Sequence, residues 1–402
     1  MKRVVITGAG SVNPLAHDVP GTYAALREGV VAIRPLDFRD VDRLSVKIGA
    51  AVRGWQPEAH FDKAALGLLD PFAQYAVVAA RQAVAQAGVV FAGALAERTG
   101  VILGSAGGGL MSSDDNYRAV YQEGRNRVHP FVVPRLMHNA GSSQIAIELG
   151  LRGPNYTVAS ACASSNHAIG QAFHLVRSGA VPVMLAGGSD AMLCFGGMKA
   201  WEGLRVMSPT GCRPFSAGRD GMVMGEGSAV FVLEERSHAM ARGAEILAEV
   251  AGFAMTSDAS DMVQPDVGGA ARAMVGALAD AKMAADEVGY INAHGTGTTA
   301  NDRSEAAAIA LVFGVGSRVL VSSTKSMHGH LIGGAGAVEL LACLLALREG
   351  VIAPTMGYVK ADPDCPLDVV PNVARQAKVT ACLSNAFAFG GLNAVLVLRR
   401  SA

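Results

Sequence analysis

Short runs of β-forming residues alternate with longer Ala- and Leu-rich runs along the whole chain. The β-type runs include residues 3–7, 101–104 and 182–186, and the helical runs include residues 71–87 and 141–149. Strands that alternate with helices of this length are typical of α/β folds. We therefore predict an α/β fold.

The length of the chain indicates more than one packed unit. Its 402 residues exceed the roughly 250 to 300 residues at which a single hydrophobic core stops growing. The α/β pattern begins again near residue 247 and ends in a β-type run at residues 394–398, although the residues themselves show no internal repeat. We expect two packed halves, residues 1–246 and 247–402.

Composition favours extensive burial. Half of the residues are hydrophobic and 17% are charged, whereas about 25% are charged in an average protein. So small a fraction of charged residues predicts that part of the surface is buried in a subunit interface. We therefore expect a homo-oligomer. The formal net charge is +0, which gives no sign of a nucleic-acid partner.

Six cysteines are scattered without the C-x-x-C spacing of a zinc ribbon, and they form no disulfide framework. The first apolar run ends at Gly8, which indicates no signal peptide. The longest apolar stretch, residues 331–347, is short and is interrupted by Glu339. We expect a soluble cytoplasmic protein without membrane insertion.

Cys162 lies between a strand-like run, residues 156–159, and an apolar-periodic segment that begins at Ala168. The thiol is therefore predicted at a strand-to-helix turn. Its neighbours are small, which permits a tight turn, and a helix N-terminus offers free N–H groups and partial positive charge. We expect this setting to lower the pKa of the thiol and to favour the nucleophilic thiolate.

Three more polar clusters follow predicted strands. His294 lies in a Gly-flanked turn after residues 288–292, and Lys325, His328 and His330 follow residues 319–323. A fourth loop, residues 384–391, also leaves a strand. Loops fixed by a rigid sheet are where catalytic side chains commonly lie, so we expect the clusters to converge.

Each piece also has a simpler interpretation. Cys162 taken alone reads as a small buried hydrophobe, and Lys325 as a buried ion-pair partner. The Gly8-Ala9-Gly10 turn resembles part of a dinucleotide fingerprint, but no suitable acidic residue follows. His328 and His330 form a possible metal pair that lacks a third ligand at a usual spacing, so no metal is predicted. The conjunction of four clusters favours a catalytic site.

Four motifs resemble the β-ketoacyl-[acyl-carrier-protein] synthases. They are Ser160-Ala-Cys-Ala-Ser-Ser165, His294-Gly-Thr-Gly-Thr298, Lys325-Ser-Met-His-Gly-His330 and Phe387-Ala-Phe-Gly-Gly391. The chain is most similar to the elongating Cys-His-His type typified by synthase II. Residues 161–170, 199–202 and 212–218 look like the nodulation E-type branch. The resemblance implies a thiolase-like fold, with two similar α/β halves in α-β-α-β-α layers, the site between them and a dimer formed edge to edge.

The resemblance implies a role for each catalytic group. Cys162 attacks an acyl thioester, and the backbone N–H groups of Cys162 and Phe389 stabilise the oxyanion. His294 and His330 stabilise the enolate that forms when malonyl thioester loses CO₂. Lys325 lies in an acidic network that includes Glu305 and orients the imidazoles.

The carrier's 4′-phosphopantetheine arm brings the substrates, and no separate cofactor is implied. Thr296 and Thr298 hydrogen-bond this arm. Phe389 is a gate, for which Gly390 and Gly391 provide the hinge.

Less specific matches concern the acyl pocket and the acyl carrier protein. Gly107 and Trp201 fall at acyl-tunnel positions, and Val133 and Met137 reach in from the partner subunit. A glycine at position 107 suggests more room, hence long, bulky or unsaturated acyl chains. The basic residues Arg205, Arg127 and Lys63 match carrier-docking positions.

Four residues depart from the family pattern, namely His328, Thr299, Leu392 and Ser216. None removes a catalytic group, but Leu392, which follows the two glycines, bears on the behaviour of the gate.

Two other functions stay open. A thiolase-type acyltransferase shares the fold but needs a second cysteine on the loop occupied by residues 387–391, where there is none. A non-catalytic partner of a heterodimeric synthase is expected to lack the nucleophile, and Cys162 argues against that reading. The residues do not distinguish primary fatty acid synthesis from specialised lipid or polyketide assembly.

Overall fold

The computed structural model describes residues 1–401 and contains a continuous eleven-stranded sheet. The strand order is β12-β10-β9-β14-β15-β8-β1-β7-β6-β4-β5. The bounds are β1 Val4–Val12, β4 Gly100–Gly104, β5 Asn155–Val158, β6 Val183–Asp190, β7 Gly227–Glu235, β8 Ala248–Ser257, β9 Tyr290–Asn292, β10 Leu320–Ser322, β12 Asp368–Val369, β14 Ala381–Ala388 and β15 Leu392–Arg399. Two small two-stranded sheets pair β2 (Arg34–Pro35) with β3 (Ile48–Gly49) and β11 (Val351–Ile352) with β13 (Arg375–Gln376).

Ten of the eleven strands form two five-stranded halves with the same plan, and β12 pairs in parallel with β10 at one edge. In the order β1-β7-β6-β4-β5, the first two pairings are antiparallel and the next two are parallel. The order β8-β15-β14-β9-β10 repeats this sequence of pairings. Only a short antiparallel pairing of residues 4–6 with residues 248–250 joins β1 to β8. The predicted second start of the α/β pattern therefore matches the start of β8.

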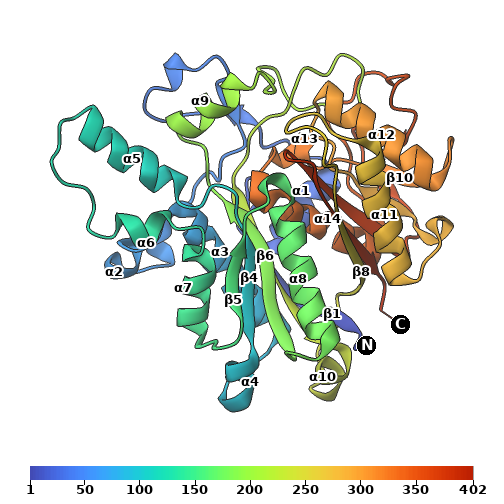
Figure 1. Ribbon diagram of the computed structural model, residues 1–402, viewed down its shortest axis with the longest axis horizontal. Coiled ribbons are helices and arrows are strands. Elements are labelled where there is room, and N and C mark those ends of the chain that lie inside the picture. Colours follow the sequence, from blue (N-terminus) through green and yellow to red (C-terminus); the bar gives the residue numbers. More distant parts are fainter. Residues whose placement is uncertain (402) are drawn as a thin grey trace.

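Helices form three layers around the two half-sheets (Figure 1). On the outer face of the first half lie α3 (Pro71–Ala87) and α7 (Ala140–Leu149), and on that of the second half lie α11 (Val267–Ala281) and α12 (Thr299–Phe313). Between the halves lie α8 (Ser164–Ser178) and α14 (Ala335–Glu349), which contact each other and strands of both halves. The predicted α-β-α-β-α layering is confirmed.

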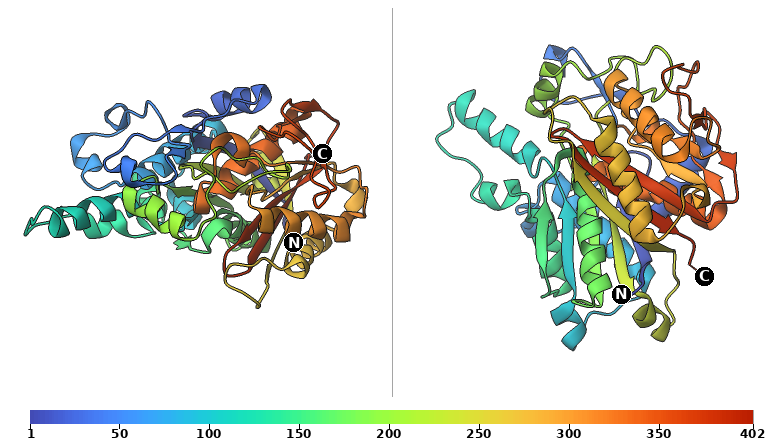
Figure 2. Two further views of the ribbon diagram at one scale, coloured as in Figure 1. Left: turned by 90° about the horizontal axis from the view of Figure 1, so that it is seen from above. Right: turned by 45° about the vertical axis from the view of Figure 1, so that its right-hand side comes forward.

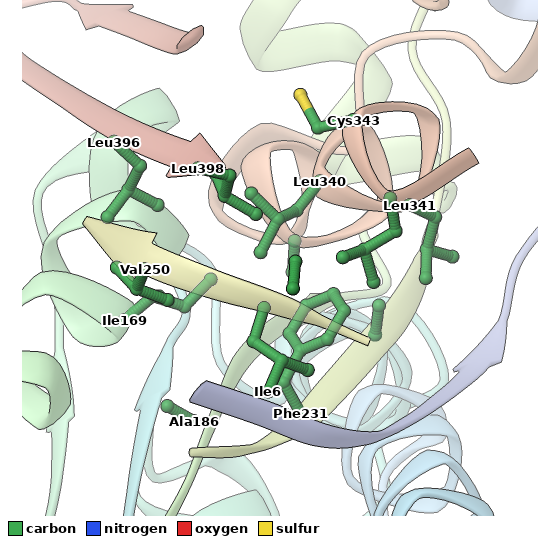
Figure 3. Packing of buried hydrophobic residues seen from close by; sticks show 14 of the residues in the cluster. Ile6, Ile169, Ala186, Phe231, Val250, Leu340, Leu341, Cys343, Leu396 and Leu398 are labelled. Carbon is green, nitrogen blue, oxygen red and sulfur yellow. The ribbon is translucent and has the colours of Figure 1, made fainter. Parts of the chain in front are cut away.

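The central core is built on these two inner helices (Figure 3). Thirteen of the fifteen residues of α14 are buried, as expected for a helix that is hydrophobic all round. Ile169 of α8 packs in the same cluster as Leu340 of α14 and Phe231 of β7. Both helices begin at loops that carry predicted site residues, so the core fixes the position of those loops.

The first strand is longer than predicted. The sequence suggested a turn at Gly8 and Gly10, but β1 runs on through both to Val12. A Cβ on Gly8 would lie 2.0 Å from the backbone oxygen of Ala83, and one on Gly10 would lie 1.9 Å from that of Ala79. The two glycines therefore allow α3 to pack closely on the strand, which excludes a dinucleotide-binding turn there.

One helical extension leads away from the body of the molecule (Figures 1 and 2). It contains α5 (Leu110–Tyr121) and α6 (Val132–Leu136). The remaining helices are α1 (Val19–Glu28), α2 (Lys63–Leu66), α4 (Gly93–Arg98), α9 (Phe195–Gly203), α10 (Arg236–Ala241) and α13 (Lys325–His328). Short 3₁₀ turns are η1 (Val41–Arg43), η2 (Pro57–Ala59), η3 (Ala161–Ala163), η4 (Ala285–Glu287) and η5 (Ile332–Gly334). Within residues 1–401, no helix has the length and apolar character that crossing a bilayer requires.

Candidate active site

Cys162 lies in the tight turn η3 between β5 and α8, as the sequence predicted. Ala161 immediately before it has a φ of +48°, a left-handed conformation that costs energy for a residue other than glycine. The Cys162 side chain is 6% exposed. Burial raises the pKa of its thiol to about 12, although the charge on Lys325 acts in the opposite direction. The prediction of a lowered pKa was therefore wrong, because desolvation of the thiolate outweighs the nearby positive charge.

His294 follows β9 in a turn whose backbone is hydrogen-bonded to Glu305 of α12. The carboxylate of Glu305 accepts hydrogen bonds from the backbone N–H of His294 at 2.8 Å and of Gly295 at 2.7 Å. The side-chain amide of Asn385 donates to it at 3.1 Å. Burial raises the pKa of Glu305 to about 7, although these bonds lower it. Glu305 thus fixes the backbone that carries His294.

His330 is held on three sides by backbone. Its N–H donates to the oxygen of Val223 at 2.7 Å, and its oxygen accepts from the N–H of Gly225 at 2.9 Å. The backbone N–H of Ile332 donates to Nδ1 of the ring at 3.1 Å. Because Nδ1 accepts this bond, the neutral ring carries its proton on Nε2.

The three groups converge. Sγ of Cys162, one ring nitrogen of His294 and one ring nitrogen of His330 all lie within 4.8 Å of one another. The two imidazole rings are 5.4 Å apart between centroids and nearly perpendicular, at 82°. Burial, followed by the charge on Lys325, lowers the pKa of both rings well below the usual value. Both rings are therefore neutral at pH 7.

The cluster has the donor types of a metal site, yet the tautomer of His330 argues against one. Nε2 of His330 is buried and has no hydrogen-bond partner within the described residues. This nitrogen carries the proton, so it is available as a hydrogen-bond donor and not as a metal ligand. The arrangement suits an oxyanion better than a cation.

Lys325 is fully buried, and its ammonium pairs with the carboxylate of Glu339 in α14. Their side chains are 0% and 1% exposed. The sequence linked Lys325 to a network containing Glu305, but in the structure Glu339 is its ion-pair partner and Glu305 bonds the His294 turn. Glu339 was noted in the sequence only as a charge that interrupts an apolar run.

Thr296 and Thr298 line the cavity, and their hydroxyl oxygens are 2.9 Å apart. Sequence reasoning missed the ion pair that supports this segment. Asp302 of α12 accepts from the backbone N–H of Gly297 at 3.2 Å and pairs with the buried Arg219 at 3.1 Å. No local motif marks this contact, because 83 positions separate the two charges in the chain.

Phe389 leaves the end of β14, and its ring stacks on Trp201 with centroids 5.9 Å apart and an interplanar angle of 24°. Gly390 and Gly391 follow with φ values of +83° and +68°, which glycine adopts without strain. The N–H of Gly390 donates to the oxygen of Met262 at 2.8 Å. The predicted gate is therefore attached to a neighbouring surface loop.

Seven of the fifteen predicted site residues line a cavity of about 230 Å³. Its lining includes Cys162, His294, Thr296, Thr298, His330, Trp201 and Phe389. Gly107, Val133 and Met137 do not line it within the single chain, and Val133 and Met137 are 58% and 38% exposed. The proposed docking residues Arg205, Arg127 and Lys63 are all exposed. Arg205 lies between Leu204 and Val206, which line the cavity.

Three of the four residues that depart from the family pattern have defined local surroundings. His328 is buried, and its ring bonds Thr324 at 2.9 Å and the oxygen of Gly329 at 2.8 Å. Burial lowers the pKa of His328 to about 3, so it is a neutral structural group. The hydroxyl of Ser216 accepts from the N–H of Val359 at 3.0 Å. Leu392 begins β15 opposite Ala388.

Comparison with known proteins agrees with this site. The family descriptions "Beta-ketoacyl synthase, N-terminal domain" and "Beta-ketoacyl synthase, C-terminal domain" match residues 1–239 and 247–359. Nodulation protein E of Rhizobium sp. (strain N33) is 48% identical over 400 residues, or 99% of both chains. The 3-oxoacyl-[acyl-carrier-protein] synthase 2 of Staphylococcus aureus (strain N315) is 40% identical over 407 residues, or 99% of this chain and 98% of its own.

A solved structure described as "The ishigamide ketosynthase/chain length factor" covers 100% of both chains, with a TM-score of 0.95 and 35% identity. The thiolase-like fold expected from the resemblance is thereby confirmed. Because its sequence, its fold and its motifs all agree with this family, the chain belongs to the beta-ketoacyl synthase family.

Proposed function

We propose that the protein is a 3-oxoacyl-[acyl-carrier-protein] synthase that holds an acyl chain on Cys162 and extends it by decarboxylative Claisen condensation with malonyl-[acyl-carrier-protein]. The observation that carries the proposal is the convergence of one buried thiol and two neutral imidazoles within 4.8 Å beside a cavity. Residues 1–246 supply the nucleophile, and residues 247–402 supply both histidines and the gate. The name of the Staphylococcus aureus relative supports this reaction.

In the first half-reaction, Cys162 Sγ attacks the carbonyl carbon of an acyl thioester on the carrier protein. The new S–C bond replaces the thioester bond of the carrier, and the thiol proton ends on the released pantetheine sulfur. Backbone N–H groups of Cys162 and Phe389 stabilise the tetrahedral oxyanion. One such donor typically contributes about a hundredfold in rate or more. Because the thiol of Cys162 has a raised pKa, it loses its proton as it attacks.

In the second half-reaction, malonyl thioester loses CO₂ and leaves an enolate. Nε2–H of His330, fixed by the bond from Ile332 to Nδ1, donates to the enolate oxygen, and His294 donates from the other side. The enolate carbon attacks the acyl carbonyl on Cys162, the C–S bond to Cys162 breaks, and the released thiolate takes up a proton from water. Neutral donors suit this step, since they stabilise the enolate without delivering it a full proton.

Lys325 and Glu305 act through other groups and are positioning residues. Burial and then the charge on Lys325 lower the pKa of both imidazoles, so Lys325 adds to the effect that keeps them uncharged. Glu305 holds the backbone of His294. Thr296 and Thr298 bond the pantetheine arm, and Phe389 swings from its stack on Trp201 to admit malonyl thioester after acylation. No cofactor is needed, because the acyl groups arrive on 4′-phosphopantetheine.

We propose acyl carrier protein as the partner at the cavity entrance. Arg205 is exposed there between two lining residues, and Arg127 and Lys63 are exposed on the same half of the chain. Their positive charge suits an acidic helix of a carrier. Charge reversal at Arg205 should slow condensation at low salt more than at high salt, whereas an unchanged rate at low salt would contradict this role.

We propose that the chain forms a homodimer through β5. This strand is the last in the sheet, carries no charge and exposes Asn155 and Tyr156, so its free backbone groups can pair with a second copy. Val133 and Met137 of the nearby extension then reach the acyl site of the other copy. The alternative is a chain length factor as partner, the kind of protein named together with the ishigamide ketosynthase. The mass of the purified protein in solution distinguishes the two.

The experiment that tests the function is intact-mass measurement after incubation with acyl-[acyl-carrier-protein] thioesters. We expect an acyl adduct that Cys162→Ala abolishes. Cys194→Ala is the matched control, since Cys194 is 7% exposed and Cys162 is 6% exposed. His330→Ala should still form the adduct but release no CO₂ from malonyl thioester. Absence of an adduct from every donor would refute the proposal and favour a non-catalytic partner subunit.

A further inference from the structure

A histidine of α8 bonds back to the turn that carries Cys162. The ring nitrogen Nδ1 of His167 lies 2.8 Å from the hydroxyl oxygen of Ser160 and 3.1 Å from the backbone oxygen of Ala163. Ser160 precedes the nucleophile by two positions, and Ala163 follows it directly. One atom of His167 therefore bridges the two ends of the turn, and Cys162 lies between them.

The turn needs such support because its backbone is strained. Ala161 has a φ of +48°, a conformation that costs energy and persists only where the surroundings hold it. The hydroxyl of Ser164, also in α8, accepts from the N–H of Ser160 at 2.9 Å and donates to the oxygen of Ala161 at 2.7 Å. Ser164 thus holds the part of the turn before Cys162, whereas His167 bonds the turn on both sides of it.

The second half of the chain keeps the His167 ring in place. The ring of Phe253 in β8 is nearly perpendicular to it, with centroids 6.3 Å apart and an interplanar angle of 80°. Further along α8, a Cβ on Gly170 would lie 2.5 Å from three atoms of the Phe253 ring, so Phe253 packs directly against the helix. The buried imidazole therefore has little freedom to turn away from the nucleophile.

The protonation state of His167 follows from these contacts. A backbone oxygen only accepts hydrogen bonds, so Nδ1 carries a proton and donates it to Ala163, with the hydroxyl of Ser160 as a second acceptor. Burial lowers the pKa of His167, although the bond to Ala163 acts in the opposite direction, and the ring is neutral at pH 7. Because Nδ1 already carries a proton, it cannot accept one from the thiol of Cys162.

We infer that His167 is a positioning residue for the acylation of Cys162, because its bridge from Ser160 to Ala163 fixes the backbone N–H of Cys162 where the tetrahedral oxyanion forms. This inference rests on the proposed function, in which that N–H is one of the two oxyanion donors. The donor moves if the turn moves, and a displacement of about 1 Å at a reacting group can cost about a hundredfold in rate. Attack by the same sulfur on a saturated carbon needs no such donor.

The test compares two reactions of Cys162 in the full-length protein, both read by intact mass. One is acylation by an acyl-[acyl-carrier-protein] thioester, and the other is alkylation by iodoacetamide, which displaces iodide and forms no oxyanion. His167→Ala should slow acylation by about ten- to a hundredfold and change the rate of alkylation by less than about twofold. His167→Asn should recover most of the acylation rate, because its amide N–H lies close to the position of Nδ1–H. His167→Gln places its amide farther from the helix backbone and should not.

His174→Ala is the matched control. His174 lies on the same helix and against the same Phe253 ring, with centroids 5.6 Å apart, but it bonds Arg177 and not the turn. This variant should leave both rates unchanged. If His167→Ala does not fold, the comparison of His167→Asn with His167→Gln decides.

Three results would contradict the inference while the proposed function stands, provided that the wild type forms an acyl adduct. They are an unchanged acylation rate in His167→Ala, a fall in acylation that alkylation matches, and an acylation rate in His167→Asn no higher than in His167→Gln. If iodoacetamide alkylates the wild type but no thioester acylates it, the proposed function fails, and the inference fails with it.

Discussion

Removing the charge of Lys325 tests its buried ion pair, whose partner, Glu339, the sequence did not identify. The side chains of Lys325 and Glu339 are 0% and 1% exposed, so Lys325→Met leaves a carboxylate with no ion-pair partner in a dry environment. Breaking a buried pair in this way typically costs about 3–5 kcal/mol, a large share of the roughly 5–15 kcal/mol that stabilises a folded protein. The double variant Lys325→Met/Glu339→Gln should recover most of this loss.

Urea unfolding measures the loss, with Arg27→Met as the control. Arg27 and Glu349 also form an ion pair, at 2.5 Å, but their side chains are 39% and 38% exposed, and an exposed pair contributes at most about 1 kcal/mol. Lys325→Met should also slow alkylation of Cys162 by iodoacetamide, because the charge on Lys325 lowers the pKa of that thiol. A Lys325→Met protein as stable as Arg27→Met, or a double variant no better than the single one, would refute the reasoning.

Three further changes test other parts of the structure. Burial raises the pKa of Glu226 from about 4.5 to about 7, so its contribution to stability is present below about pH 4.5 and lost as the pH rises through 7. Glu226→Gln should remove about 3 kcal/mol of that decline in urea titrations between pH 5 and 8, and an unchanged slope would contradict this. Ala161→Val should destabilise the protein by about 1–2 kcal/mol while Ala161→Gly should not, because φ at this position is +48°; equal melting temperatures would contradict the strain. Trp201→Leu should release Phe389 from a stack worth about 0.5–1.5 kcal/mol. Iodoacetamide should then alkylate Cys162 up to about tenfold faster. A slower rate of alkylation would argue against a gate held closed by Trp201.

Much of the fold and of the candidate site could be predicted because the informative residues are local. Cys162 lies between a recognisable strand and a recognisable helix, and the turns with His294 and His330 follow strands that pair in parallel at the same edge. The polar groups therefore converge as soon as the sheet forms. The helix predicted at residues 71–87 has those bounds in the structure.

The errors arose where a property depends on contacts distant in sequence. The pKa of the Cys162 thiol depends on how completely this side chain is buried, and residues of the second half of the chain contribute to that burial. Glu339 is separated from Lys325 by 14 positions, and in the sequence alone it resembles a helix interruption. A Cβ on Gly107 would lie 2.8 Å from Sδ of Met192, a residue 85 positions away, so the sequence alone could not show what occupies the space beside Gly107. Gly8 and Gly10 suggested a turn. The same Gly-x-Gly sequence also occurs in a strand on which a helix packs closely, and the sequence alone does not distinguish the two.

The shared inner layer of α8 and α14 has a consequence for synthesis of the protein on the ribosome. When residue 246 has been made, α8 is complete but α14, which packs against it, is not. At about 5–20 residues per second, the roughly one hundred further residues to the end of α14 take on the order of 5–20 s. During that interval the nascent first half exposes the apolar face that α14 later covers, and this face is a natural target for chaperones. We expect the release of any chaperone to follow the emergence of residue 349, not that of residue 246.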